Sequence, residues 1–249
     1  MAGHSKWKQI KHKKAATDSK RGAVFTKIIK EITVAARFGG GDPAGNPRLR
    51  TAIDAAKAEN MPSDNIERAI KKGTGQLEGV TYDDIMYEGY GPGGAAILVQ
   101  ATTDNQNRTV SEVRFLFSRH GGNLGAQNSV AWMFDKKGLI TLDATRQEED
   151  AALEAALDAG ADDMSRDGDQ YLITTTPATL HTVQDALKKK GFHPTSAEIA
   201  MVPKNTVKVG AGDARNLLGL MEELDEHDDV SKVFSNFDID AETLAAVGG

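Results

Sequence analysis

Residues 1–38 read MAGHSKWKQIKHKKAATDSKRGAVFTKIIKEITVAARF, and the organisation of the whole chain follows from this stretch. Through residue 30 it holds nine Lys/Arg against a single acid, Asp18. Charged side chains at this density cannot be buried, so this end of the chain needs either water or a polyanion around it. Nucleic acid is the polyanion that soluble proteins most often meet through such an arm. The stretch therefore predicts a nucleic-acid-binding end.

The stretch divides into an arm and a helix. Residues 1–16 carry no apolar stripe, and we expect them to form a mobile arm. A helix is predicted to begin at Thr17 or Ser19, because either can act as an N-cap. Its apolar residues, Phe25, Ile28, Ile29, Ile32 and Ala36, have the spacing of one buried face. At about 100° per residue, Lys20, Lys27, Lys30 and Arg37 fall together on the other side, which predicts a solvent-facing basic ridge.

The candidate binding residues follow from this charge, which is of one sign, whereas salt-bridged solvent faces alternate in sign. Phosphate contacts are predicted for Lys6, Lys8, Lys11, Lys13, Lys14, Lys20, Arg21, Lys27, Lys30 and Arg37. His12 is a candidate for contacts with bases or sugars. Trp7 either stacks on an exposed base or anchors the arm on the helical domain, and the sequence leaves both alternatives open.

The rest of the chain is acidic. Residues 1–72 hold 16 Lys/Arg against 7 Asp/Glu, and residues 73–249 hold 14 against 29. An acidic body repels phosphate, which confines nucleic-acid contact to the basic end. We expect this body to dock on a protein partner or to hold the arm in register. The sequence does not determine the oligomeric state, and a monomer is compatible with it.

Nothing in the sequence indicates catalysis, a metal, a cofactor or a membrane span. The chain has no cysteine, its six histidines share no metal-ligand spacing, and its glycine-rich segments lack the position or spacing of phosphate loops. The apolar runs are far too short to cross a bilayer, and the N-terminus lacks the apolar core of a signal peptide. We expect a cytoplasmic, non-enzymatic protein without a cofactor. An enzyme built from residues far apart in the sequence is the remaining alternative.

Local patterns predict three short helices and then a mixed α/β body. The second helix follows Asn46-Pro47, an N-cap with proline at the first helical position, and the third follows Ser63 as a cap and ends with Lys71 and Lys72. Strands are expected at 82–88, 95–103 and 130–134, with a helix at 108–120. Tyr87, Tyr90 and Trp132 are expected to pack in the core or at its rim.

Residues 138–202 read as a complete β-α-β-β-α-β set, the split βαβ arrangement, with Thr145 and Glu148 as a capping box. Residues 205–237 add one more β-α-β. We therefore predict an α+β fold: an N-terminal three-helix domain followed by two ferredoxin-like (split βαβ) domains, the last inserted into the middle one. The predicted domains are 1–79, 80–134 plus 204–249, and the inserted 135–203. Three consecutive domains are the alternative. In that arrangement the strands before and after the inserted set would form two separate half-sheets, each with an uncovered apolar face.

Several motifs are similar to those of one known family. They are residues 1–7 (MAGHSKW), 10–14 (IKHKK), 40–43 (GGDP), 60–62 (NMP), 64–70 (DNIERAI), 87–94 (YEGYGPGG) and 107–109 (NRT). As a set they are highly specific, and the chain resembles the YebC family, which includes the mitochondrial translational activator of cytochrome c oxidase. The match is strong to about residue 134 and continues in layout beyond it.

The resemblance implies three domains with the third inserted into the second, and neither catalytic residues nor a cofactor. Family members are commonly described as DNA-binding transcriptional regulators, while some look like ribosome-associated translation factors that bind structured RNA. DNA and ribosomal RNA therefore both remain as expected partners. Ala23 departs from relatives that carry Lys after Arg-Gly. The opening at the motif resembles a bacterial member.

Overall fold

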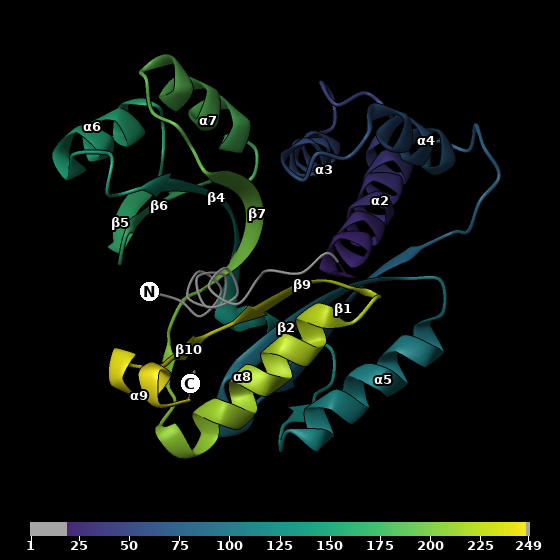
Figure 1. Ribbon diagram of the computed structural model, residues 1–249, viewed down its shortest axis with the longest axis vertical. Helices are drawn as coiled ribbons and strands as arrows, with labels where there is room; N and C mark the ends of the chain where they lie inside the picture. Colours follow the sequence, from purple (N-terminus) through teal and green to yellow (C-terminus); the bar gives the residue numbers. More distant parts are fainter. Residues whose placement is uncertain (1–18, 248–249) are drawn as a thin grey trace. The chain divides into compact units, whose positions relative to one another are not determined.

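The structure is a computed structural model that describes residues 19–247, without the side chains of Ser19, Lys20, Arg21 and Ala241 (Figure 1). It contains two compact units. One comprises the chain up to Phe134 together with the chain from Pro203 onward, and the other is Asp135–Val202. The second unit thus interrupts the first. The predicted fold class, an N-terminal helical region followed by α/β sheet domains of which one is inserted, is confirmed.

The N-terminal helices are α2 (Ser19–Gly39), α3 (Pro47–Ala58) and α4 (Ser63–Gly73). The predicted apolar face of α2 packs against the other two helices. Ile32 and Ala36 are buried there, and Phe25, Ile28 and Ile29 lie at the margin of the same cluster. Gly73 lies where α4 meets α2, since a Cβ on it would come within 2.3 Å of the Thr33 carbonyl oxygen. Only glycine fits at this contact.

Asn46 joins α2 to α3. Its side-chain oxygen accepts from the Leu49 amide at 3.1 Å, which confirms the predicted N-cap. Its side-chain nitrogen donates to the carbonyls of Ala35 and Gly40, both at 2.8 Å. The predicted Ser63 cap is wrong, because the N-cap of α4 is Pro62 and no side chain caps that helix. A proline at the cap leaves only backbone and solvent to satisfy the first turn.

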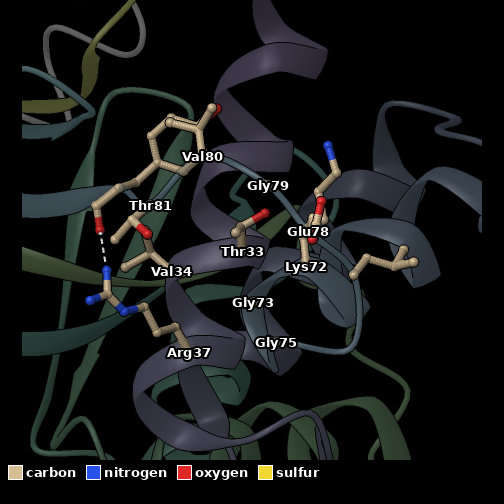
Figure 2. Close-up of a pocket in the computed structure, with 12 residues that line it drawn as sticks. Thr33, Val34, Arg37, Lys72, Gly73, Gly75, Glu78, Gly79, Val80 and Thr81 are labelled. Carbon is tan, nitrogen blue, oxygen red and sulfur yellow. Dashed lines mark hydrogen bonds between the residues drawn. The ribbon is translucent and has the colours of Figure 1, made fainter.

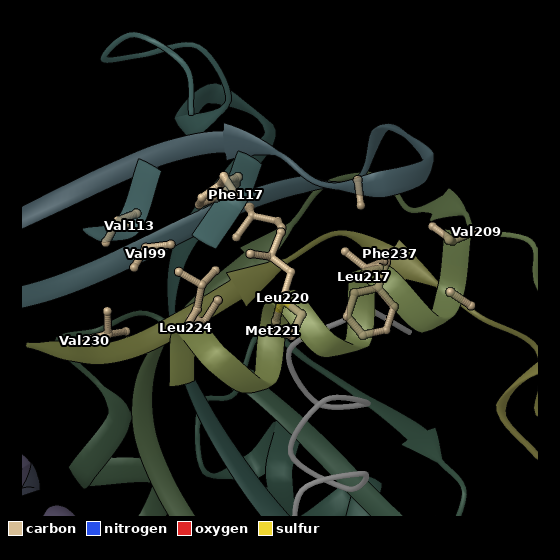
Figure 3. Packing of buried hydrophobic residues seen from close by; sticks show 14 of the residues in the cluster. Val99, Val113, Phe117, Val209, Leu217, Leu220, Met221, Leu224, Val230 and Phe237 are labelled. Atoms are coloured by element: carbon tan, nitrogen blue, oxygen red, sulfur yellow. The ribbon is translucent and has the colours of Figure 1, made fainter. Parts of the chain in front are cut away.

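The first unit contains a four-stranded antiparallel sheet in the order β3-β1-β2-β9. Its elements are β1 (Asp83–Tyr90), β2 (Ala96–Thr103), α5 (Gln106–Arg119), β3 (Asn123–Leu124), α8 (Ala211–Glu226) and β9 (Val230–Ser235). Residues of α5 and α8 pack with the sheet in one apolar core that includes Val99, Phe117 and Leu220 (Figure 3). Because β9 follows the insertion and pairs with β2, this sheet needs chain from both sides of it.

Short elements complete this unit. A 3-10 turn, η1 (Pro92–Gly94), links β1 to β2. Beyond the insertion, β8 (Val207–Lys208) pairs in parallel with β10 (Phe237–Asp238). The described chain ends in α9 (Ala241–Val247), which the sequence patterns did not predict.

The strand predicted at 130–134 is wrong. Residues 125–130 form a loop, and a 3-10 turn, η2 (Ala131–Met133), leads into the next strand. The Glu88 carboxylate explains the difference, because it accepts hydrogen bonds from the amides of Asn128, Val130 and Ala131 at 2.7–2.8 Å. In a β-strand these amides would instead donate to the carbonyls of a neighbouring strand. Trp132, which was expected in the core or at its rim, lies outside the core, since 64% of it is exposed.

The second unit has the split βαβ topology that the sequence predicts. Its elements are β4 (Phe134–Asp143), α6 (Glu149–Asp158), β5 (Asp163–Asp167), β6 (Gln170–Thr175), α7 (Leu180–Lys189) and β7 (Ser196–Pro203), and the strand order is β5-β6-β4-β7. Ile140, Ile173 and Val183 lie in its separate apolar core. The predicted capping box is wrong, because Thr145 bonds back to Asp143 at 2.6 Å and α6 starts after Glu148 without a side-chain cap.

Candidate nucleic-acid interface

The basic residues in the middle of α2 bind the C-terminal end of α8 and the turn that follows it. The Lys27 ammonium donates to the carbonyl of Asp225, and the Lys30 Nζ lies 3.0 Å from the carbonyl oxygen of Asp228. The last carbonyls of a helix carry partial negative charge and lack partners within the helix, so cations stabilise them. The prediction that Lys27 and Lys30 lie on a solvent-facing ridge is therefore wrong. Their charges neutralise acceptors of the α/β body.

Asp229 is the centre of this contact and is 4% exposed. Its Oδ1 accepts from Lys30 at 2.8 Å. Its Oδ2 accepts from the guanidinium of Arg108 and the hydroxyl of Thr109, both at 2.8 Å. The hydroxyl of Thr103 adds a longer bond at 3.3 Å. One buried carboxylate thus joins α2, the start of α5 and the end of β2.

These contacts set the protonation of the group. Burial by itself raises the pKa of the Asp229 carboxyl, but hydrogen bonds from Lys30, Arg108 and Thr109 outweigh it, and the pKa lies well below its usual range. The same carboxylate raises the pKa of Arg108, chiefly through its hydrogen bond to the guanidinium. Asp229 and Arg108 are therefore ionised throughout the physiological pH range.

Arg48 makes a second connection between the helices and the sheet. Its guanidinium bonds both oxygens of Glu31 on α2, at 2.7 and 3.0 Å, and its NH1 lies 2.8 Å from Oδ2 of Asp84 on β1. Burial lowers the pKa of Arg48, yet the two carboxylates raise it above its ordinary value. Paired planar contacts of this kind favour arginine over lysine, so this cation also has a structural role.

The cations left for an external phosphate are distributed over α2, α3 and α4. Among the described residues of the helical region, the exposed basic side chains are Arg37, Lys57, Arg68, Lys71 and Lys72. Arg37 and Lys72 line an open cavity of about 620 Å³, enclosed by α2, the end of α4 and residues 75–82 (Figure 2). Arg37 donates from NH1 to the Tyr82 carbonyl at 3.0 Å, which holds its guanidinium at the cavity wall. Glu78 is the one acid among the lining residues.

The predicted site residues separate into three groups. Lys6, Trp7, Lys8, Lys11, His12, Lys13 and Lys14 lie outside the described residues, as do the side chains of Lys20 and Arg21. Lys27 and Lys30 bind the α/β body, and Arg37 is exposed at the cavity. Sequence reasoning treated Lys71 and Lys72 only as partners of a helix end. Their position in a basic half of the chain was the signal that could have added them.

Glu112, His227 and Asp229 lie close enough to share a cation. Their hydrogen bonds account for them without one. The Asp229 amide donates to Nδ1 of His227 at 3.1 Å, so Nε2 carries the proton and bonds Glu112 at 2.9 Å. The oxygens of Asp229 are already bound by two cations, and a metal would have to displace them. We propose no metal there.

Among the described residues, no helix is both long and apolar enough to cross a bilayer.

Comparison with known proteins gives a consistent result along the chain. The family described as "TACO1/YebC protein N-terminal domain" matches residues 5–76, and "TACO1/YebC second and third domain" matches residues 82–237. The chain is 59% identical over 244 residues, 98% of each chain, to a "Probable transcriptional regulatory protein" of Geobacter sulfurreducens. It is 58% identical over 245 residues to one of Gemmatimonas aurantiaca, covering 98% of this chain and 99% of the relative.

A solved structure is also similar. It is a conserved hypothetical protein from Aquifex aeolicus, 47% identical, with a TM-score of 0.82, and the match covers 90% of this chain and 92% of that chain.

Proposed function

The chain belongs to the TACO1/YebC family, and on that basis we propose that it is a non-enzymatic, cytoplasmic regulator of gene expression that binds nucleic acid through residues 1–79. The single observation that carries the proposal is the confinement of excess positive charge to this end of an otherwise acidic chain. Phosphate neutralisation supplies most of the affinity of such an interface. The basic arm, Arg37, Lys71 and Lys72 would make these contacts.

The names of the relatives favour DNA as the target and transcription as the process. In this form of the proposal, the chain is a DNA-binding transcriptional regulator, and the acidic α/β body contacts a protein partner. Specificity would have to come from the shape of the DNA or from that partner, because the exposed basic residues of the helical region are suited to phosphates.

The burial of α2 favours a second candidate, a translation factor bound to structured RNA of the ribosome. A recognition helix must present one free face to the major groove. Among the described side chains of α2, those between Lys27 and Ala36 are all at least partly buried, because α3 and α4 cover one side and the α/β body binds Lys27 and Lys30 on another. A helix held on two sides cannot enter a groove. Structured RNA is recognised by backbone and shape without such a helix.

Sedimentation of a cell lysate at low salt separates the two candidates. The transcriptional proposal expects the protein near the top of the gradient, with crosslinks to discrete chromosomal sites. The translational proposal expects it with ribosomal particles, released by RNase, and without sequence preference on duplex DNA. A purified chain that binds neither duplex DNA nor structured RNA at low salt would contradict the proposed function in both forms.

A further inference from the structure

The motif 87–94 builds a rigid loop that the proposed function does not use. Glu88 is 4% exposed and carries its carboxylate into this loop, where it accepts the amides of Asn128, Val130 and Ala131. Tyr90 donates its hydroxyl to the Ser129 carbonyl at 3.2 Å. A buried carboxylate is costly unless its acceptor positions are filled, and here three backbone donors fill them. The strand therefore fixes the course of residues 125–131.

The glycines of the two segments allow this close approach. A Cβ at Gly89 would lie 2.6 Å from the Asn123 carbonyl oxygen, and a Cβ at Gly125 would lie 2.5 Å from Oγ of Ser129. A side chain at Gly89 would displace β3 from β1, and one at Gly125 would collide with Ser129 inside the loop. The glycine-rich motif thus has a structural purpose, and that purpose is the placement of the loop and of η2 after it.

The loop presents an indole ring to solvent. Trp132 is 64% exposed, although tryptophan side chains are highly buried on average. Its Nε1 donates to the Ser129 carbonyl at 3.0 Å, so the polar edge of the ring is satisfied and the ring plane is held. What remains for a ligand is the flat π surface. Lys204 donates its ammonium to the backbone carbonyl of Trp132 at 3.0 Å, which places a positive charge at the backbone of the same residue.

The residues around Trp132 indicate which class of ligand the ring would bind. Protein hot spots combine aromatic rings with a dry apolar patch. In the loop that precedes Trp132 the amide side chains of Gln127 and Asn128 are exposed, and Lys204 is exposed as well. An exposed ring whose polar edge is already bonded, with a cation at its own backbone carbonyl, matches an unpaired nucleotide, whose base can stack on the ring while its phosphate is attracted to the lysine.

We propose that Trp132 is a stacking contact for an unpaired base of a nucleic acid, at a second site in the α/β body. This inference rests on the proposed function, since it assigns a further contact to the same ligand. Stacking on an aromatic side chain contributes about 1–3 kcal/mol per base, which corresponds to about 5- to 140-fold in affinity. The contribution is insensitive to salt, because no counterion is released.

The test measures binding of a single-stranded oligouridylate and of an RNA duplex to the full chain. Trp132→Ala should weaken oligouridylate binding by about 5- to 140-fold without changing the slope of log K against log salt, and should affect the duplex much less. Trp132→Phe should recover most of the loss. Phe115→Ala on α5 is the matched control, because this ring is 62% exposed but lies on a helix and not after the loop that Glu88 fixes. The affinity of the Phe115→Ala variant for oligouridylate should stay at the wild-type level.

A direct readout uses the fluorescence of Trp132 in a Trp7→Phe background, where oligouridylate should quench the emission. Equal oligouridylate affinity for Trp132→Ala and wild type would overturn the stacking site while leaving the proposed function intact, and would leave the ring as a contact for protein. Equal losses for Trp132→Ala and Phe115→Ala would overturn it as well. If the wild-type chain binds neither probe, this inference fails, and the proposed function fails with it only if the chain also does not bind duplex DNA.

Discussion

The Nζ atom of Lys30 lies 2.8 Å from Oδ1 of Asp229, although 199 residues separate them in the sequence. The two side chains are 12% and 5% exposed. A lysine that looked like part of a phosphate-binding ridge is one half of a buried ion pair. Any nucleic acid that used Lys30 would have to break this pair and leave Asp229 partly uncompensated.

Removing either partner should lower the free energy of unfolding. Asp229→Ala leaves the Lys30 ammonium buried without its carboxylate, and the expected loss is about 3–5 kcal/mol. Lys30→Met should cost less, about 1.5–3 kcal/mol, because Arg108 and Thr109 still bind Asp229. Urea unfolding measures both values. Lys57→Met, at an exposed position of α3, is the control and should change stability by less than about 0.5 kcal/mol.

The same pair predicts a dependence on pH. The folded pKa of Asp229 lies below its value in the unfolded chain, about 3.9, so the folded state binds this proton less readily. The stabilisation is therefore complete above the unfolded pKa and is lost as pH falls through it toward the folded pKa. Asp229→Asn should flatten the decline of stability below about pH 4. A variant that follows the wild-type acid curve at constant offset would show that this carboxyl does not drive the decline.

The sequence predicted burial and helix starts correctly for residues whose contacts are with neighbours in the sequence. The apolar spacing of α2 predicted the burial of Ile32 and Ala36, and Asn46-Pro47 predicted a helix start, because both patterns depend on neighbours within a few residues. Whether Lys27 and Lys30 face solvent or bind the α/β body depends on acceptors 198 and 199 residues away in the sequence. A row of positively charged residues on a helix has the same sequence pattern whether its partner is phosphate, water or the end of α8.

The loop around residues 125–131 shows the same limit. Residues 130–134 have strand-like composition, yet the amides of Val130 and Ala131 are captured by a carboxylate of another strand. Nothing near Glu88 in the sequence identifies it as a buried acceptor. Charged residues are normally assigned to the surface, and its three donors come from some 40 residues away.

The loop gives a stability prediction of its own. Glu88→Gln removes the charge and turns a donor toward backbone donors, and we expect a loss of about 1–3 kcal/mol. Hydrogen exchange should quicken at the amides of Asn128, Val130 and Ala131 before it changes in the helices. Glu67→Gln, the same substitution at an exposed position of α4, is the control and should leave these amides unchanged. Uniform acceleration across the unit would mean that Glu88 supports the whole sheet and not the loop alone.

The inserted domain predicts different behaviour for two fragments. Residues 135–203 hold a complete sheet with its own core of Ile140, Ile173 and Val183, and should unfold cooperatively when expressed alone. Residues 73–134 lack β9 and α8, so Val99 and Phe117 would lose their covering side chains, and this fragment should not melt cooperatively. Thermal unfolding followed by circular dichroism tests both. Cooperative melting of 73–134 as a monomer would contradict the inserted arrangement.

The arm is expected to carry the salt-dependent part of binding. Deleting residues 2–15 removes five lysines, Lys6, Lys8, Lys11, Lys13 and Lys14. The slope of log K against log salt should flatten by about 0.7–0.9 for each phosphate that the shortened chain no longer neutralises, because fewer counterions are released. Replacing Arg37 and Lys72 with Met in the full chain should flatten it by at most two such steps, since these residues supply two charges at the cavity. Thermal stability of the deletion should stay near that of the full chain, because the connections made by Lys30 and Arg48 remain. An unchanged salt slope would remove the arm from the interface and leave the exposed cations of the helical region to bind the phosphates.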